Sequence, residues 1–243
     1  MIYKRVLGGK IIHAHDATEL DHSNCKRPYC RSRFDVCEIP TDFSTDAFEI
    51  ETYMGNKEPR EWPIYDHYEK CDSPVDLGLL YVCRQIYKES LFVLFQTSTF
   101  TRQDCEDGDS LDFLQELSPS QSARLTSLSL TSMNSFPVVS EEATARLTGL
   151  KSLEIGLDVT TGGSTLEVLR ELEKSFEDSG MESFQRLNIK SVRINMKMLG
   201  QRAYIEDVRQ GQEKVISWLK LMEKRIMQSI EARSESSLIG EHR

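Results

Sequence analysis

The stretch Leu125-Thr126-Ser127-Leu128-Ser129-Leu130 decides the fold, because its leucines follow one another at intervals of three and two residues. The same spacing returns in Leu150-x-x-Leu153-x-Ile155, 25 residues later, and in Phe184-x-x-Leu187-x-Ile189, a further 34 residues along. Repeats of this kind are typical of leucine-rich-repeat strands, whose leucines face the core while the intervening residues line an open surface. The sequence therefore predicts three strands, near residues 125–130, 150–157 and 187–196.

Helix-start signals separate these strands. Ser140 is placed to cap a helix over residues 141–148, and Ser164 and Glu167 have the spacing of a capping box. Gly180 can end the second helix. Strands that alternate with helices indicate a parallel α/β layer. An ordinary three- or four-stranded parallel sheet fits equally well, because the repeats are irregular and lack the Asn expected at each turn. The apolar stripe of the second helix is predicted to be Leu166, Leu169, Leu172 and Phe176.

The first half of the chain contains a clear helix at about residues 74–96. Ser73 can cap it, Pro74 suits its first position, and apolar residues then recur at steps of three and four. A short strand built around Phe100 is expected next, followed by a small helix over residues 111–117. Nearer the amino terminus, Ile11-Ile12 forms a short extended piece.

A long helix over residues 203–232 is predicted near the carboxy terminus, with a break near Gly211. A terminal helix that is polar outside can cap the open end of a repeat array. A dimerising coiled coil is the alternative, but the apolar residues keep no strict heptad, so capping is favoured.

These patterns predict an α+β or α/β protein with two parts. Residues 1–122 form the first part, with a flexible acidic insertion over about 16–73, where no periodicity is sustained. Residues 123–233 form a leucine-rich-repeat-like layer with its carboxy-terminal helix, and residues 234–243 form a disordered tail.

Composition limits the classes of function. The 243 residues are 39% hydrophobic and 28% charged, as in ordinary globular proteins, and the net charge of −9 argues against nucleic-acid or anionic-membrane partners. No stretch approaches the roughly 20 apolar residues that span a bilayer, and no signal peptide is recognisable. Six cysteines are too few for a disulfide framework, so we expect an intracellular location, cytoplasmic or nuclear.

Four soft ligands, His22, Cys25, Cys30 and Cys37, are the weak candidates for a metal site. A tetrahedral zinc site needs four such atoms, but these spacings lack the two-residue knuckles of familiar zinc modules. Free thiols in a surface loop are the favoured interpretation. No metal and no cofactor is therefore predicted.

No catalytic motif is recognisable, and no histidine lies between His67 and His242. Residues 161–165, Thr-Gly-Gly-Ser-Thr, could receive a phosphate, but they lack the Lys of a P-loop, so an ordinary helix start is favoured. An enzyme with a non-standard site near His13, His15 and His67 is the alternative function.

The segment Leu79-Leu80-Tyr81-Val82-Cys83-Arg84-Gln85-Ile86-Tyr87-Lys88-Glu89-Ser90, continued by Ser98-Thr99-Phe100, resembles the LLxVCRQIYxEA…NTF signature of a large group of uncharacterised fungal proteins. The resemblance implies an F-box-like helical amino-terminal part and a ubiquitin-ligase adaptor as partner. That group's Leu-Pro-x-Glu-Ile-Arg leader is missing ahead of Ile2, which weakens the adaptor expectation and suggests a truncated gene model.

The function expected from the sequence is a non-enzymatic protein–protein interaction module, with the character of a substrate receptor. The exposed positions of the repeated strands are the candidates for partner contact, and their small, polar side chains suit a modest, specific surface. These positions are Ser127, Ser129, Thr131, Ser152, Glu154, Gly156, Arg186, Asn188 and Lys190.

Overall fold

The computed structural model of the protein describes residues 10–14, 34–38, 48–53, 92–103, 109–161 and 164–227. These residues contain one seven-stranded sheet with the order β2-β1-β4-β5-β6-β7-β3. Neighbouring strands run parallel except β1 and β2, which are antiparallel. The strands are β1 (Lys10–Ala14), β2 (Phe34–Glu38), β3 (Phe48–Tyr53), β4 (Thr99–Gln103), β5 (Ser127–Met133), β6 (Ser152–Thr161) and β7 (Ser191–Gln201).

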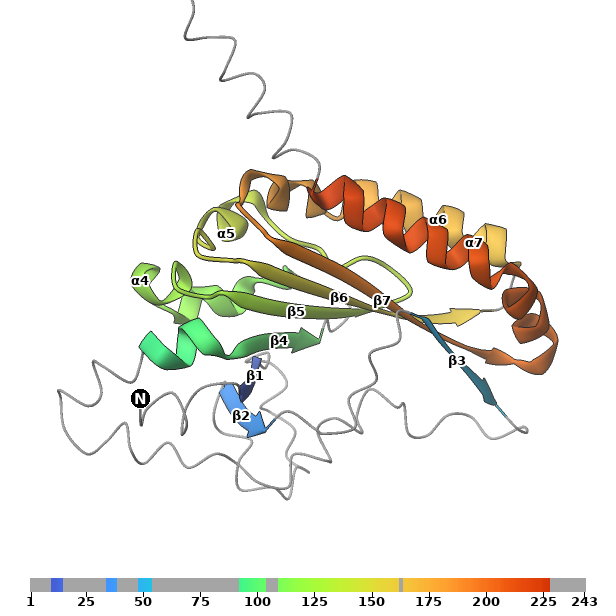
Figure 1. Cartoon of the computed structure of the whole chain (residues 1–243), viewed down its shortest axis with the longest axis horizontal. Coiled ribbons are helices and arrows are strands. Elements are labelled where there is room, and N and C mark those ends of the chain that lie inside the picture. Colours follow the sequence, from blue (N-terminus) through green and yellow to red (C-terminus); the bar gives the residue numbers. More distant parts are fainter. Residues whose placement is uncertain are drawn as a thin grey trace, which may run out of the picture.

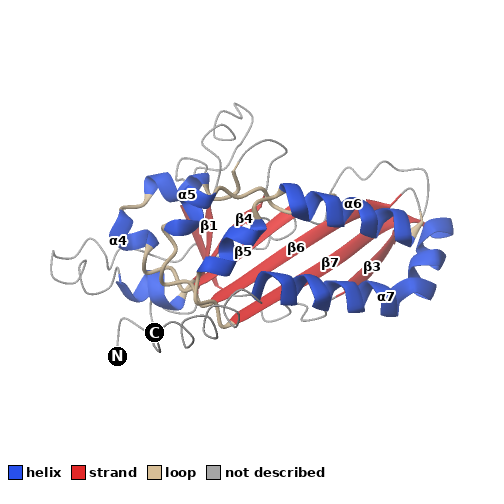
Figure 2. Cartoon of the chain, turned by 90° about the horizontal axis from the view of Figure 1, so that it is seen from above, coloured by secondary structure: helices blue, strands red, loops and turns tan. Residues whose placement is uncertain are grey.

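The helices α5, α6 and α7 lie together on one face of this sheet (Figures 1 and 2). The sheet grows in one direction from β4 to β7, because each strand pairs with the one before it in the chain. Right-handed crossovers between such strands all place their helices on the same face of the sheet. Residues 92–97 are also helical. The remaining helices are η4 (Asp112–Glu116), α4 (Pro119–Ser122), α5 (Glu141–Ala145), α6 (Thr165–Asp178), η5 (Met181–Arg186) and α7 (Arg202–Met227).

Alternate strand residues form buried rows that cross the sheet beneath these helices. Phe100, Leu128, Leu153 and Val192 are register partners from strand to strand and make one such row. The helices complete the core with side chains spaced by three or four residues, as a buried helix face requires. On α6 these are Val168, Leu169, Leu172 and Phe176, and on α7 they are Val215, Leu219, Met222 and Ile226.

An arginine stands in the next row of the core. Arg102 of β4 is the register partner of Leu130, yet only 4% of its surface is exposed. Its Nη2 atom lies 3.3 Å from Oδ1 of Asp112 on η4. A buried guanidinium requires a charged partner, so this pair fixes η4 against β4.

The mixed α/β class predicted from the sequence is confirmed, as are several of its elements. β4, β5 and β6 lie where strands are expected, and β1 contains the extended pair Ile11-Ile12. The small helix at 111–117 is present as the 3-10 helix η4, and Ser140 caps α5 by accepting a hydrogen bond from the Ala143 N–H at 3.2 Å. Of the helix expected over 74–96, residues 74–91 lie outside the described ranges.

The start of α6 confirms the capping box. The Ser164 N–H and its hydroxyl each donate to Oε2 of Glu167 at 2.9 Å, and the Glu167 N–H donates back to the serine Oγ at 3.4 Å. The predicted stripe is wrong at one position, because Leu166 is 53% exposed. Val168 is buried instead, since the inward face includes Thr165, which packs against α7.

Replacing Glu167 with glutamine is expected to lower the melting temperature at neutral pH. The Ser164 backbone N–H and then its hydroxyl hold the pKa of this exposed carboxyl below its usual range. A depressed pKa means that the carboxylate stabilises the folded chain above the unfolded-state pKa, and that this stabilisation is lost as the pH falls through the folded-state pKa. Thermal melts of both proteins from neutral to acidic pH should therefore converge. Glu171→Gln on the same helix is the control, and a gap that persists unchanged in acid would refute this prediction.

The long helix α7 is continuous, so the predicted break at Gly211 is wrong. A Cβ at this position would lie 3.2 Å from Cγ2 of Thr165, which shows that the glycine permits close packing of α7 on α6. α7 lies beside α6 over β7 and β3 (Figure 2). α7 thus covers one face of the sheet near β7. It does not cover the outer edge of β7, because that edge is paired with β3. Residues 228–243, including the predicted tail, lie outside the described ranges.

Two strands lie within the stretch 16–73, where no regular structure was expected. β2 pairs with β1, and β3 pairs with β7 at the opposite edge of the sheet. β4 and β5 are also paired, so a single sheet extends across the boundary expected at residue 122. Among the described helices, none is long and apolar enough to cross a membrane.

Candidate functional site

The face of the sheet turned away from α5, α6 and α7 carries a regular array of polar side chains. Each polar residue of β5 has a register partner on β6, which in turn has one on β7, so the array consists of rows of three residues that cross the strands. Most of these residues are half-buried, while Ser191 and Arg193 are exposed. We call this array the open strand face; its rows are Ser127, Ser152 and Ser191, then Ser129, Glu154 and Arg193, then Thr131, Gly156 and Asn195.

Side chains on the open strand face contact one another across the strands. Oγ of Ser127 lies 3.0 Å from Oγ1 of Thr99 on β4. Nδ2 of Asn195 donates to Oε1 of Glu154 at 2.5 Å. A Cβ on Gly156 would lie 2.9 Å from Oγ1 of Thr131, so the missing side chain leaves room for the threonine. The side chains of this face are therefore polar and packed against one another.

The register shifts the third repeat from residue 184 to residue 189. Leu153 is opposite Val192 and Ile155 is opposite Ile194, so the third copy is Ile189-x-x-Val192-x-Ile194. Ile189 is buried, as are the first residues of the other copies, Leu125 and Leu150. The predicted copy Phe184-x-x-Leu187-x-Ile189 lies in η5 and the turn before β7, so this repeat assignment is wrong, although β7 overlaps the strand expected near 187–196.

This shift separates the predicted contact residues into two groups. Those of β5 and β6, from Ser127 to Gly156, share the open strand face. Arg186, Asn188 and Lys190 precede β7, so the pattern missed Ser191, Arg193 and Asn195, which occupy the equivalent positions. Arg186 forms an ion pair with Glu141 of α5.

One asparagine does stand at the turn that follows a repeat. Asn134 follows β5 with a positive φ of 56°, a backbone conformation that asparagine tolerates better than most residues. Its Oδ1 accepts from the Thr160 N–H at 2.7 Å and from the Thr160 hydroxyl at 2.8 Å. The side chain thereby continues the pairing of β5 with β6 beyond the end of the shorter strand.

A protein-family model described as domain of unknown function DUF7730 matches residues 1–176. The chain belongs to this family. Searches of curated proteins and of solved structures find no match. The DUF7730 match contains β1 to β6 and most of α6, while η5, β7 and α7 follow it. The β7 member of each row, Ser191, Arg193 or Asn195, is thus contributed by residues beyond the DUF7730 match.

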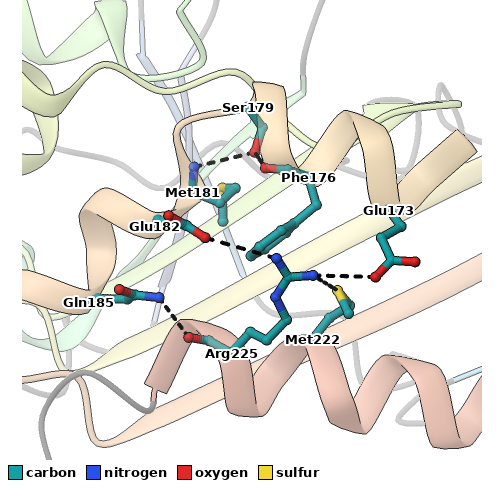
Figure 3. Close-up of polar contacts among 8 residues, drawn as sticks. All are labelled: Glu173, Phe176, Ser179, Met181, Glu182, Gln185, Met222 and Arg225. Carbon is teal, nitrogen blue, oxygen red and sulfur yellow. Dashed lines mark hydrogen bonds and ion pairs between the residues drawn. The ribbon is translucent and has the colours of Figure 1, made fainter. Parts of the chain in front are cut away.

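Arg225 joins the end of α7 to the DUF7730 match (Figure 3). Its guanidinium carbon lies 4.7 Å from the ring centroid of Phe176, and Nη1 lies 3.5 Å from Oε1 of Glu173. Nη2 lies 3.9 Å from Oε1 of Glu182 on η5, and the Arg225 carbonyl accepts from Nε2 of Gln185 at 2.9 Å. Each of these partly exposed ion pairs contributes at most about 1 kcal/mol to the stability of the fold. The main effect of the cluster is therefore to fix the orientation of α7 against α6 and η5.

The chemical sites considered from the sequence fall largely outside the described ranges. His22, Cys25 and Cys30 lie outside them, as do His15 and His67, while Cys37 is in β2 opposite Ile11 and His13 is in β1 opposite Thr101. At the start of α6, the carboxylate of Glu167 accepts from the Ser164 N–H and the Glu167 N–H donates to the serine Oγ, so these two amides are already bonded, which opposes the phosphate alternative there. The described residues include no cluster of three His, Cys, Asp or Glu side chains that could hold a metal.

Proposed function

We propose that the protein is a non-enzymatic protein–protein interaction module whose leucine-rich-repeat-like sheet binds a partner on the open strand face. The observation that supports this most is the register of β5, β6 and β7. It turns every second residue of these strands to the face opposite α5, α6 and α7, and it stacks the repeated apolar residues beneath those helices. The stacked L-x-x-L-x-L positions support the leucine-rich-repeat comparison.

The chemistry of the open strand face also supports this proposal. Hydroxyl side chains, a glycine and an amide give a surface that can be desolvated at lower cost than a fully charged one. The rim carries exposed charges, as the rims of specific, non-obligate interfaces do.

The change Ser129→Trp is expected to abolish partner capture by placing a bulky indole in the middle row of the open strand face. Gln212→Trp, at an exposed position on α7, is the matched control because it adds the same indole elsewhere. The tagged full chain and both variants would be recovered from cells that express the protein, and co-purifying proteins would be quantified by mass spectrometry. A partner that contacts residue 129 should fall about tenfold or more with Ser129→Trp only. Equal recovery with all three chains would contradict the proposal.

A finer proposal follows from the resemblance of the VCRQIY segment. We propose that the amino-terminal part is F-box-like and that the protein acts inside the cell as a substrate receptor for a ubiquitin-ligase adaptor. Binding of the purified adaptor to this chain, and to a chain preceded by a Leu-Pro-x-Glu-Ile-Arg leader, tests this role. Binding by neither chain would refute it and would leave the open strand face unaffected.

A further inference from the structure

Three cations gather where β6 and β7 begin. Lys151 and Lys190 precede these strands by one residue, and Arg193 is the third residue of β7. The N–H groups of Lys190 and Ser191 donate to the Lys151 carbonyl at 2.8 and 3.1 Å, which places the two lysines on adjacent repeats. All three side chains are exposed, and we call them the basic corner.

The cations of the basic corner form no ion pair with any described residue. Glu154 is directly opposite Arg193 in the register, where opposite charges ordinarily attract. Its carboxylate is instead bound to Asn195, two residues further along β7. Three other arginines of the described chain do have acidic partners: Arg102 has Asp112, Arg186 has Glu141 and Arg225 has Glu173.

Two hydroxyl groups adjoin these cations. Ser152 and Ser191 are register partners on the open strand face, each directly after a lysine of the basic corner. Within the described ranges their hydroxyls make no side-chain hydrogen bond, in contrast to Ser127, which is bonded to Thr99. Ammonium, guanidinium and hydroxyl groups together offer the donors that bind carboxylates.

The arrangement costs free energy in the unbound chain, because like charges on neighbouring strands repel. The chain as a whole carries a net charge of −9, so an acidic partner is repelled elsewhere and attracted at this corner. Electrostatic complementarity of this kind sets the orientation of a partner more than its overall affinity.

We propose that the basic corner binds an acidic segment of a protein partner, a run of Asp and Glu whose carboxylates meet Lys151, Lys190 and Arg193. This inference rests on the proposed function, because Arg193 is part of the open strand face and the two lysines directly precede its first row. Carboxylates of the segment pair with these three cations and accept hydrogen bonds from Ser152 and Ser191. The acidic segment enters at the start of β6 and β7, and the rest of the partner lies along the strands.

A labelled poly-glutamate peptide is the probe for this surface, with fluorescence anisotropy as the measurement. The full chain should bind it, and added salt should weaken binding. The triple variant K151E/K190E/R193E should raise Kd about tenfold or more. The control K174E/K214E/K220E makes the same change of charge at exposed lysines of α6 and α7, on the other side of the sheet, and should leave Kd within about twofold. Equal loss with both triple variants, or no binding by the unaltered chain, would overturn the proposal.

Other occupants of the basic corner give distinguishable results. A single-stranded RNA that binds more tightly than poly-glutamate, and loses affinity with the same triple variant, would overturn the assignment to a protein. A dimer in sedimentation that the basic-corner variant dissociates would assign the surface to a second copy of the chain. If captured partners are lost with Ser129→Trp but kept with K151E/K190E/R193E, the acidic segment is refuted while the interaction module stands.

Discussion

Replacing Phe136 with alanine is expected to lower the free energy of unfolding by about 3–5 kcal/mol. Phe136 follows β5 in the connection to α5, yet it is only 1% exposed. Its ring lies 5.1 Å from that of Phe176 at an interplanar angle of 80°, and 6.1 Å from the indole of Trp218. Truncation would leave a cavity between α6 and α7 that the surrounding rings cannot fill. Urea unfolding followed by circular dichroism measures the change.

Val138→Ala in the same connection is the matched control. Val138 is 50% exposed, so this change should stay within about 0.5 kcal/mol. A similar loss for both variants would mean that the connection as a whole, and not the buried ring, supports the two helices.

The change Gly180→Ala is expected to destabilise the protein by about 2–4 kcal/mol, for two reasons. Gly180 has a φ of 73°, a conformation that strains residues with a side chain. An added Cβ would also lie 2.3 Å from the Val139 carbonyl oxygen, which is backbone and cannot rotate away. The midpoint of urea unfolding should fall accordingly.

Gly180→Asn separates these two causes. Asparagine tolerates positive φ better than alanine but carries the same Cβ. Because the contact with Val139 remains, asparagine should restore little of the lost stability. A nearly complete recovery with asparagine would show that backbone strain, and not the close approach, requires glycine at this turn.

The repeated strands could be predicted because their information is local. Leu125, Leu128 and Leu130 lie on one short segment, and burial of that segment follows from its spacing alone. The third repeat was misplaced because Phe184, Leu187 and Ile189 imitate the motif, although the first two belong to η5 and the turn that follows. Phe184 and Leu187 are buried for a different reason, because η5 and its end pack on the core, whereas Ile189 is the first buried residue of the true third repeat.

The rest of the fold and of the candidate site depends on contacts between distant residues. The position of β3 beside β7 cannot be read from either strand, because both offer the same backbone groups to any neighbour. The burial of Arg102 depends on Asp112 of a separate element, η4, and among the described residues Arg193 has no acidic partner because Glu154 is bonded to Asn195. The capping box of α6 was predicted in full because its two residues are only three positions apart.

The pairing of β3 with β7 also has a consequence for synthesis on the ribosome. Phe48 is opposite Met196, so more than half of the chain must be translated after β3 before its partner exists. At typical elongation rates this interval is on the order of ten seconds, far longer than the microseconds in which a hairpin forms. β1, β4, β5 and β6 can assemble in order as they emerge, whereas β3 can join the sheet only near the end. In the nascent protein, the completion of this edge therefore reports that translation has passed β7.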